Sequence, residues 1–167
     1  MPGAGYSGQL RIACRVASIG HLWNEVRVQN GAYGADMGIR DNGVLTAYSY
    51  RDPSAKTSLQ AIRRTGGFLR DNASESLEPF IIGAISDAEP LLSPSLMGTV
   101  SDMWYFKGIT PEYRQRLRRQ MLRCTSEELI ACAEQIDACM DHSCVCVLGP
   151  EEQLAACADL TVEHLTK

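Results

Sequence analysis

The sequence predicts an α+β fold, a two-layer sandwich in which helices pack on one face of a mostly antiparallel sheet. Three observations support this class. Two strand-like segments joined by a tight turn lie near the N-terminus, a series of helical patterns follows, and a short β-branched segment lies near the C-terminus. A sheet of about three or four strands would be small. Because the sequence starts directly in a helical pattern, we expect that an N-terminal strand lies outside it.

The first expected element is a helix from Gln9 to Arg27. Its apolar residues recur at intervals of one, three or seven and form one buried stripe, made of Ile12, Ala13, Val16, Trp23 and Val26. Two glycines then surround one aromatic residue in Asn30-Gly31-Ala32-Tyr33-Gly34, where the backbone can turn sharply or approach another group closely. We therefore expect a turn from helix to strand at this pentapeptide.

Two strands are expected next, over residues 35–40 and 44–50. Asp41-Asn42-Gly43 separates them with residues that tolerate a positive φ, which predicts an antiparallel hairpin. After the hairpin, Asp52 is expected to cap a helix whose first residue is Pro53, since proline has no N–H to leave unpaired there. The buried face of this helix is expected to contain Leu59, Ile62, Gly66 and Leu69.

Helical patterns dominate the rest of the sequence, over residues 77–88, 94–107, 110–123 and 125–140. Thr110 can cap the helix that begins at Pro111, and Thr125 with Glu128 forms a capping box. Residues 144–148 are apolar and β-branched in part, which favours a central strand. A short helix is expected from Glu151 to about Cys157.

Length and composition limit the classes of function. The 167 residues are 45% hydrophobic and 22% charged, without repeats or linkers, which predicts one globular domain over residues 1–167. A net charge of -4 gives no overall attraction to nucleic acid or anionic lipid, and no apolar run approaches the roughly 18 residues of a membrane span. The seven irregularly spaced cysteines favour reduced thiols. We therefore expect a cytoplasmic protein with neither nucleic-acid nor membrane partners.

The histidines do not form a zinc peptidase site. Such a site needs two histidines one helical turn apart with a carboxylate beside them, and His21, His142 and His164 lack this spacing. His21 and Glu25 instead predict a surface pair on one helix face. No metal is therefore expected in this chain.

Two other clusters admit a functional and a structural interpretation. Residues 141–146 contain a histidine and a Cys-x-Cys, but they lack the paired ligands of a structural zinc site, so packing of Cys144 and Cys146 in the core is favoured. The same interpretation covers Cys132 and Cys139. Five arginines between residues 114 and 123 could bind nucleic acid, yet they spread around the helix, which favours a solvated face or an interdomain contact.

Two motifs resemble those of a known family. Residues 27–34, Arg-Val-Gln-Asn-Gly-Ala-Tyr-Gly, resemble the Arg-Val-x-x-Gly-Ala-Tyr-Gly signature of the presequence-protease branch of the insulinase and pitrilysin family of zinc metallopeptidases. Residues 49–53, Ser-Tyr-Arg-Asp-Pro, resemble the strand-to-helix junction of the same branch. Their order and spacing agree, so the resemblance covers nearly the whole chain. It implies the C-terminal, fourth domain of a longer multi-domain peptidase.

The resemblance also implies roles for particular residues. The parent would close two halves over an unfolded peptide and hold zinc in its N-terminal half through an inverted His-x-x-Glu-His motif, which this chain lacks. The isolated chain would therefore be inactive. Arg27 and Tyr33 would reach across the chamber as the residues that complete the catalytic site, and Gly31 and Gly34 would join them in binding substrate.

The chemistry of both side chains suits these roles. The Arg27 guanidinium could hold the carbonyl oxygens of an extended peptide, and the Tyr33 phenol could donate to the oxyanion that forms during hydrolysis. Alternatively, Arg27 is a cation favoured by the dipole at a helix C-terminus, and Tyr33 is a half-buried aromatic at a turn. The resemblance favours the functional interpretation.

The expected partners are the N-terminal half of the same polypeptide and peptide substrates. An isolated domain could also dimerise through an exposed sheet edge. The alternative function is a non-catalytic structural or binding subunit of the same fold that packs against a catalytic partner.

Overall fold

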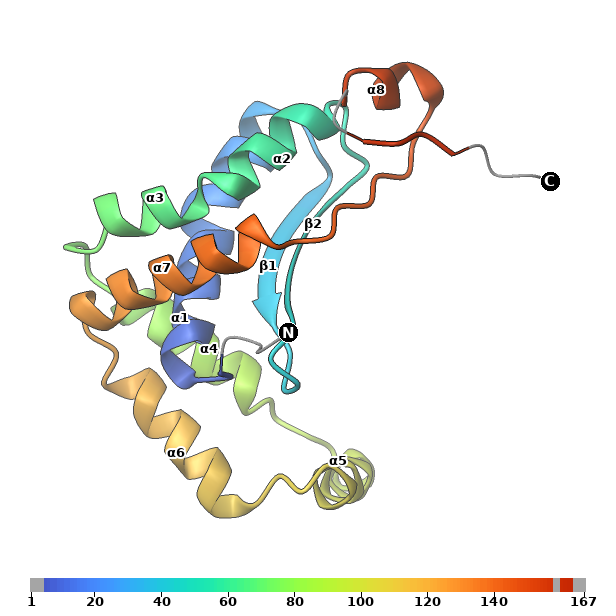
Figure 1. Cartoon of the computed structure of the whole chain (residues 1–167). Helices are drawn as coiled ribbons and strands as arrows, with labels where there is room; N and C mark the ends of the chain where they lie inside the picture. Colours follow the sequence, from blue (N-terminus) through green and yellow to red (C-terminus); the bar gives the residue numbers. More distant parts are fainter. Residues whose placement is uncertain (1–4, 158–159, 164–167) are drawn as a thin grey trace.

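The computed structural model describes residues 5–157 and 160–163. The elements follow in the order α1 (Gly8–Val16), the π-helix η1 (Ala17–Gln29), β1 (Gly34–Ile39), β2 (Leu45–Tyr50), α2 (Ala55–Arg63), α3 (Thr65–Asp71), α4 (Glu78–Ala88), α5 (Pro94–Phe106), α6 (Pro111–Leu122), α7 (Ser126–Asp141) and α8 (Glu151–Ala155) (Figure 1). Helices pack on one face of an antiparallel hairpin, which confirms the predicted α+β class.

The hairpin of β1 and β2 has one covered face and one open face. Met37 pairs with Ala47 in the register, and both contribute to the face that packs on the helices, together with Ala35, Ile39 and Leu45. Side chains alternate along a strand, so Tyr48 and Tyr50 lie on the other face, where each is more than half exposed. Gly43, with a φ of 79°, closes the predicted tight turn. The hairpin therefore presents tyrosines on its open side.

The two edges of the hairpin differ. The Ser18 hydroxyl of η1 accepts from Met37 N (2.9 Å), and its oxygen lies 2.6 Å from Asp36 Oδ1 and 3.0 Å from Met37 O, which covers the outer edge of β1 at this residue. The N–H and C=O groups of Met37 point away from β2, so Met37 and Ala47 form a non-hydrogen-bonded pair. The N–H and C=O groups of Ala47 therefore point away from β1. The described residues offer no hydrogen-bond partner to those groups of Ala47. An open edge therefore remains at β2, as the prediction of edge-mediated dimerisation requires.

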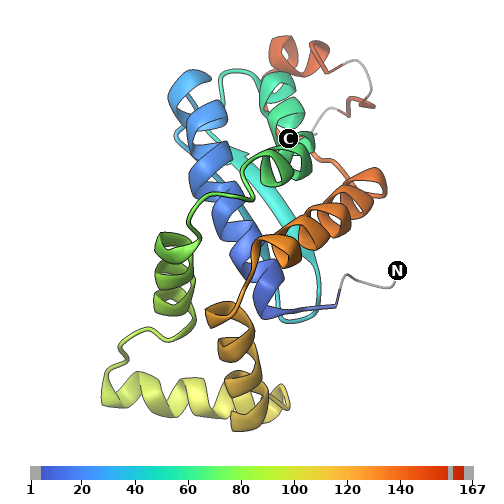
Figure 2. The same ribbon diagram turned by 90° about the vertical axis from the view of Figure 1, so that its left-hand side faces the viewer.

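The first helix is wider than predicted over its second half. Figure 2 shows α1 and η1 as one continuous helix that crosses the hairpin. In a π-helix each N–H bonds to a carbonyl five residues back, so the buried face recurs at longer intervals than in an α-helix. In η1 this geometry buries Ala17, His21 with Leu22, and Val26. Trp23, predicted to lie in the buried stripe, is instead 42% exposed.

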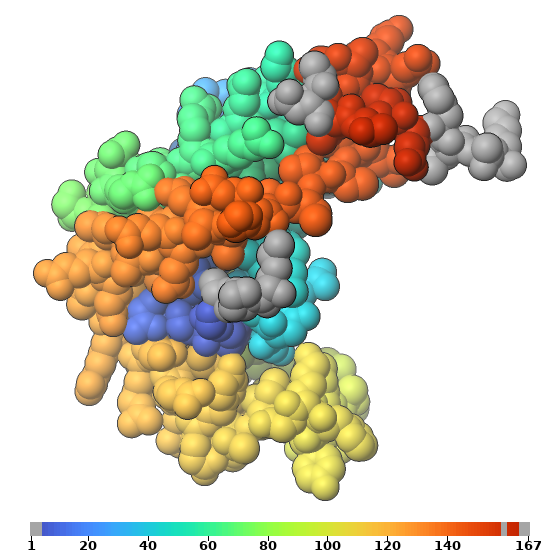
Figure 3. All heavy atoms as spheres, viewed as in Figure 1, coloured from blue at the N-terminus to red at the C-terminus, as the bar shows by residue number. Residues whose placement is uncertain are grey.

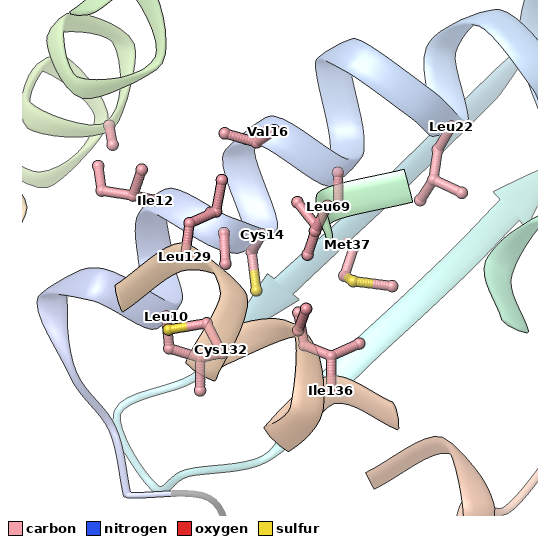
Figure 4. Close-up of a cluster of buried hydrophobic side chains, with 14 of the residues drawn as sticks. Leu10, Ile12, Cys14, Val16, Leu22, Met37, Leu69, Leu129, Cys132 and Ile136 are labelled. Carbon is pink, nitrogen blue, oxygen red and sulfur yellow. The ribbon is translucent and has the colours of Figure 1, made fainter. Parts of the chain in front are cut away.

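The hydrophobic core lies between α1, η1, α3, α7 and the hairpin. Figure 4 shows side chains from these elements directed toward one another, with Leu22 on η1, Met37 on β1, Leu69 on α3 and Ile136 on α7. Helices α1 and α6 approach each other closely. A Cβ at Gly8 would lie 2.5 Å from the carbonyl oxygen of Leu117, which only glycine avoids. The hairpin therefore rests on a tightly packed helical layer.

The predicted capping signals are confirmed for α6 and α7 but not for α2, where Ser54 rather than Asp52 is the N-cap residue. Thr110 accepts a hydrogen bond from Tyr113 N at 3.2 Å, and Thr125 and Glu128 form the predicted reciprocal capping box. The helix predicted to begin at Pro53 begins at Ala55, because Asp52 Oδ1 binds the backbone N–H of Ser54 (2.9 Å) in the preceding turn. The helical pattern that follows is divided at Arg64 into α2 and α3.

The predicted strand over residues 144–148 is wrong. These residues run between α7 and α8 without pairing in a sheet, and within the described residues the sheet consists of β1 and β2. Cys144 and Cys146 are exposed, so the prediction that they pack in the core is wrong as well.

The prediction of core packing is confirmed for Cys132, whereas Cys139 is only partly buried. Cys14, Cys124 and Cys132 are buried and unbridged. Burial raises the pKa of the Cys14 and Cys124 thiols to about 12 and that of Cys132 to about 11. The protonated form is therefore retained at neutral pH, and these thiols act as small hydrophobic groups in the core.

Helix α5 stands apart from this core. It buries none of its residues, although it is rich in large apolar side chains, and it forms part of a lobe at one end of the molecule (yellow in Figure 3). Arg114 of α6 stacks its guanidinium on the Trp104 ring at 3.8 Å. Among the described helices, none has the length and apolar character needed to cross a membrane.

Candidate functional site

The turn after η1 places the first motif at one end of the hairpin. Gly31 adopts a φ of 78°, which favours glycine, and ends the helix. The N–H groups of Gly31 and Ala32 then donate to the carbonyls of Arg27 (3.2 Å) and Val26 (3.1 Å). The backbone of this turn is therefore well satisfied, and it leads directly into β1 at Gly34, as the sequence predicts.

Tyr33 lies on this turn and is held by the end of β2. Its backbone N–H donates to Tyr50 O (3.0 Å) and lies 3.4 Å from Arg51 O. The Tyr33 and Tyr50 rings meet edge to face, with centroids 6.1 Å apart. Tyr33 is nevertheless 65% exposed, which does not fit the alternative interpretation of a half-buried aromatic at a turn. An exposed aromatic phenol on a fixed backbone remains available to another molecule.

Side-chain hydrogen bonds also join the two motifs. The Asn30 side-chain amide lies 3.0 Å from Asp52 Oδ1 and 2.9 Å from Ser58 Oγ. Asp52 Oδ1 also accepts from Ser54 N, while Asp52 Oδ2 is buried without a partner among the described residues. The turn that carries Tyr33 is thus tied to the junction between β2 and α2 by side-chain and backbone hydrogen bonds.

Arg27 lies on the last turn of η1, and its guanidinium stacks over the Trp23 ring, 3.9 Å from the centroid. Among the described interactions, none joins the side chains of Arg27 and Tyr33. A stacked guanidinium keeps its N–H donors at its edges, so Arg27 can stack and bind an oxygen at the same time. The structure therefore places Tyr33 against Tyr50 and Arg51, whereas the described contact of the Arg27 guanidinium is with Trp23.

The two predicted glycine positions differ in their surroundings. A Cβ at Gly34 would meet nothing within 4 Å, so the backbone there is open to another chain. Gly31 is required by its φ, and a Cβ there would lie 3.6 Å from the Pro53 ring. Gly34 therefore has open space on its Cβ side, whereas Gly31 serves the turn.

Arg51 and Tyr50 were not predicted as site residues. The Arg51 guanidinium lies 5.7 Å from the Tyr33 centroid and 5.5 Å from the Tyr50 centroid, within the range of cation–π attraction. Arg51 stands in the second motif, but spacing alone gives no signal that the two motifs meet in space. Tyr33, Tyr50 and Arg51 are called the tyrosine–arginine cluster below.

The described residues contain no group of three or more histidine, cysteine, aspartate or glutamate side chains that could hold a metal ion. His21 is buried, with Nε2 2.8 Å from Ala61 O and its ring stacked on Phe68. The predicted surface pair with Glu25 is therefore wrong, and Glu25 instead pairs with Arg64 at 3.3 Å. His164 lies outside the described residues.

The arginines of α6 are partly used within the molecule. Besides the stacking of Arg114, the Arg116 guanidinium lies 5.0 Å from the Tyr113 ring centroid and Arg118 forms an ion pair with Glu89. Arg114, Arg116 and Arg118 therefore each have a partner within the molecule.

Comparison with known proteins identifies the class. Residues 2–149 match the family described as the PreP C-terminal domain. The class is thus a domain of presequence-protease-type peptidases, as the two motifs predicted. This chain belongs to the PreP C-terminal domain family.

The similar proteins are much longer than this chain. Protein HypA of Clostridium perfringens is 32% identical over 93% of this chain and 16% of its own length. Presequence protease 1, chloroplastic/mitochondrial, of Arabidopsis thaliana is 34% identical over 81% of this chain and 13% of its own length. The mitochondrial presequence protease of Drosophila melanogaster is 29% identical over 84% of this chain and 14% of its own length. The chain spans about one seventh of such proteins.

Proposed function

We propose that this chain forms part of the chamber wall of a zinc-dependent endopeptidase that degrades unfolded peptides. Tyr33 and Arg27 would contact the substrate and the transition state there. Zinc would be held by the N-terminal half of the same polypeptide, and the isolated chain would be inactive. Membership of the PreP C-terminal domain family and the names of the similar proteins support this proposal. The observation that carries it is the exposed Tyr33 phenol on a backbone braced from both motifs.

The open face of the hairpin suits an extended peptide. Tyr33, Tyr48 and Tyr50 offer flat apolar rings, and the backbone at Gly34 is unobstructed. A phenol donor aimed at the oxyanion of a tetrahedral intermediate stabilises the transition state more than the ground state. Arg27, which needs no change of charge, would hold carbonyl oxygens of the same peptide.

A probe on this face tests the proposed substrate contact. In the full-length peptidase, a photo-crosslinking phenylalanine analogue at position 48 is expected to form an adduct with an unfolded peptide on illumination. Tyr48 is 55% exposed on the open face, and the ring of the analogue resembles the one it replaces. Mass spectrometry of the adduct would identify the crosslinked residue.

The matched control is the same analogue at Leu122, which is 56% exposed on α6 in the helical layer. Excess unlabelled peptide should suppress the adduct at position 48. Equal labelling at both positions, or none at position 48, would contradict a substrate-facing role for the hairpin.

Helix α5 supports the proposed packing against the rest of the parent. Large apolar side chains on a helix normally pack against another surface, yet Leu96, Met97 and Phe106 of α5 are each more than half exposed. The similar proteins contain several times more chain than this domain, enough to cover such a surface. We assign the remainder of the same polypeptide as the occupant.

Charged residues introduced on α5 should therefore affect the full-length peptidase and the isolated 167-residue chain differently. Leu96→Glu with Phe106→Glu is expected to destabilise the full-length peptidase by about 2 kcal/mol or more, because each would bury an unpaired charge. The 167-residue chain alone should change little, since both side chains are already exposed there. Thermal unfolding of both proteins measures the difference. Equal destabilisation in both, or none in the full-length protein, would contradict the assignment.

A further inference from the structure

Arg51 has an unusual backbone. Among the described residues it is the one non-glycine residue with a positive φ, 48°. Left-handed backbone costs residues with a Cβ free energy, and it persists where the surroundings impose it. Glycine would occupy this position without that cost. The presence of a long cationic side chain at a position that suits glycine therefore requires another explanation.

This conformation brings both the backbone and the side chain of Arg51 to Tyr33. The Arg51 carbonyl lies 3.4 Å from Tyr33 N, beside the shorter contact from Tyr50 O. The guanidinium lies within 6 Å of the Tyr33 and Tyr50 ring centroids. In the described part of the chain, no ion pair engages Arg51. Its contacts are thus directed to the tyrosines rather than to an acidic partner.

We propose that Arg51 is a positioning residue for Tyr33, a role that rests on the proposed function. Tyr33 is largely exposed, so packing alone leaves its ring free to change rotamer. The Arg51 cation near both rings and the edge-to-face contact with Tyr50 together restrict that freedom. The backbone strain at Arg51 is the cost of placing the cation there.

Replacement by glycine separates stability from activity. In the full-length peptidase, Arg51→Gly is expected to lower kcat/KM roughly ten-fold, mainly through kcat, because a misplaced donor loses transition-state stabilisation. The thermal midpoint should stay the same or rise, since glycine relieves the strain. Arg51→Lys keeps the charge and should recover part of the activity. Arg51→Ala also removes the cation and should lower kcat/KM to a similar extent. Its matched control is Arg63→Ala, which removes an exposed arginine on α2 and should behave as wild type.

A double-mutant comparison tests whether Arg51 acts through Tyr33. In a Tyr33→Phe background the phenol is absent, so Arg51→Gly should cause less than about a two-fold further loss. Additive losses, unchanged kcat/KM in Arg51→Gly, or parallel losses of activity and thermal midpoint would each overturn the positioning role. If Tyr33→Phe itself matches wild type, the proposed function fails, and the role of Arg51 fails with it. If Tyr33→Phe loses activity and Arg51→Gly does not, the inference about Arg51 alone fails.

Discussion

Tyr33→Phe in the full-length peptidase is expected to lower kcat/KM about ten-fold to a thousand-fold, the range for loss of a transition-state hydrogen-bond donor. The substitution removes the phenol oxygen and keeps the ring, so the contacts with Tyr50 and Arg51 remain. Because the residue is 65% exposed, the free energy of unfolding should scarcely change. Steady-state kinetics on an unfolded peptide measures the effect.

Tyr48→Phe is the matched control for this prediction. Tyr48 is a comparably exposed tyrosine on the same face, but its partner in the register is Asp36 and it lies outside the tyrosine–arginine cluster. Removal of the Tyr48 hydroxyl should change kcat/KM by less than about two-fold. Arg27→Ala should show a loss within the same range as Tyr33→Phe. Kinetics indistinguishable from wild type in both Tyr33→Phe and Arg27→Ala would rule out the roles assigned to these residues.

Leu129→Ala is expected to reduce the free energy of unfolding of the 167-residue chain by about 2–5 kcal/mol, because it leaves a cavity in a close-packed core. Leu129 is 0% exposed on α7 and belongs to the cluster between α1, α3 and the hairpin (Figure 4). Loss of this packing would loosen the layer on which the hairpin rests. Chemical denaturation followed by circular dichroism gives the change in midpoint.

Leu122→Ala makes the same chemical change at a leucine that is 56% exposed. It should cost about 0.5 kcal/mol or less, as is usual for surface positions. A similar loss at both leucines would show that burial in the core does not govern stability.

Much of the candidate site could be predicted from local sequence signals. The turn around Gly31, the hairpin over Ala35 to Tyr50 and the helix caps all depend on residues close together in sequence. The motifs identified the family, and the family match confirms that identification. The roles of Arg27 and Tyr33 stay predictions.

The tyrosine–arginine cluster could not be predicted in the same way. Its contacts join Tyr33 to residues 17 and 18 positions later, and they depend on the register of the hairpin and on the φ of Arg51. Burial of His21 and exposure of Trp23 likewise follow from the π-helical geometry of η1 and its contacts. A pattern based on 3.6 residues per turn misplaces both side chains.

The sequence by itself determined the α+β class, the helix caps, the hairpin turn and the family, because each depends on short-range backbone preferences or on contiguous motifs. Tertiary structure decided which apolar segments are buried. Residues 144–148 have the composition of a strand but no paired neighbour, and α5 is apolar but uncovered, since pairing and burial require a partner surface at the right place. Tertiary structure also decided that Arg51 meets Tyr33, because only the paired strands and the braced turn bring the two motifs together.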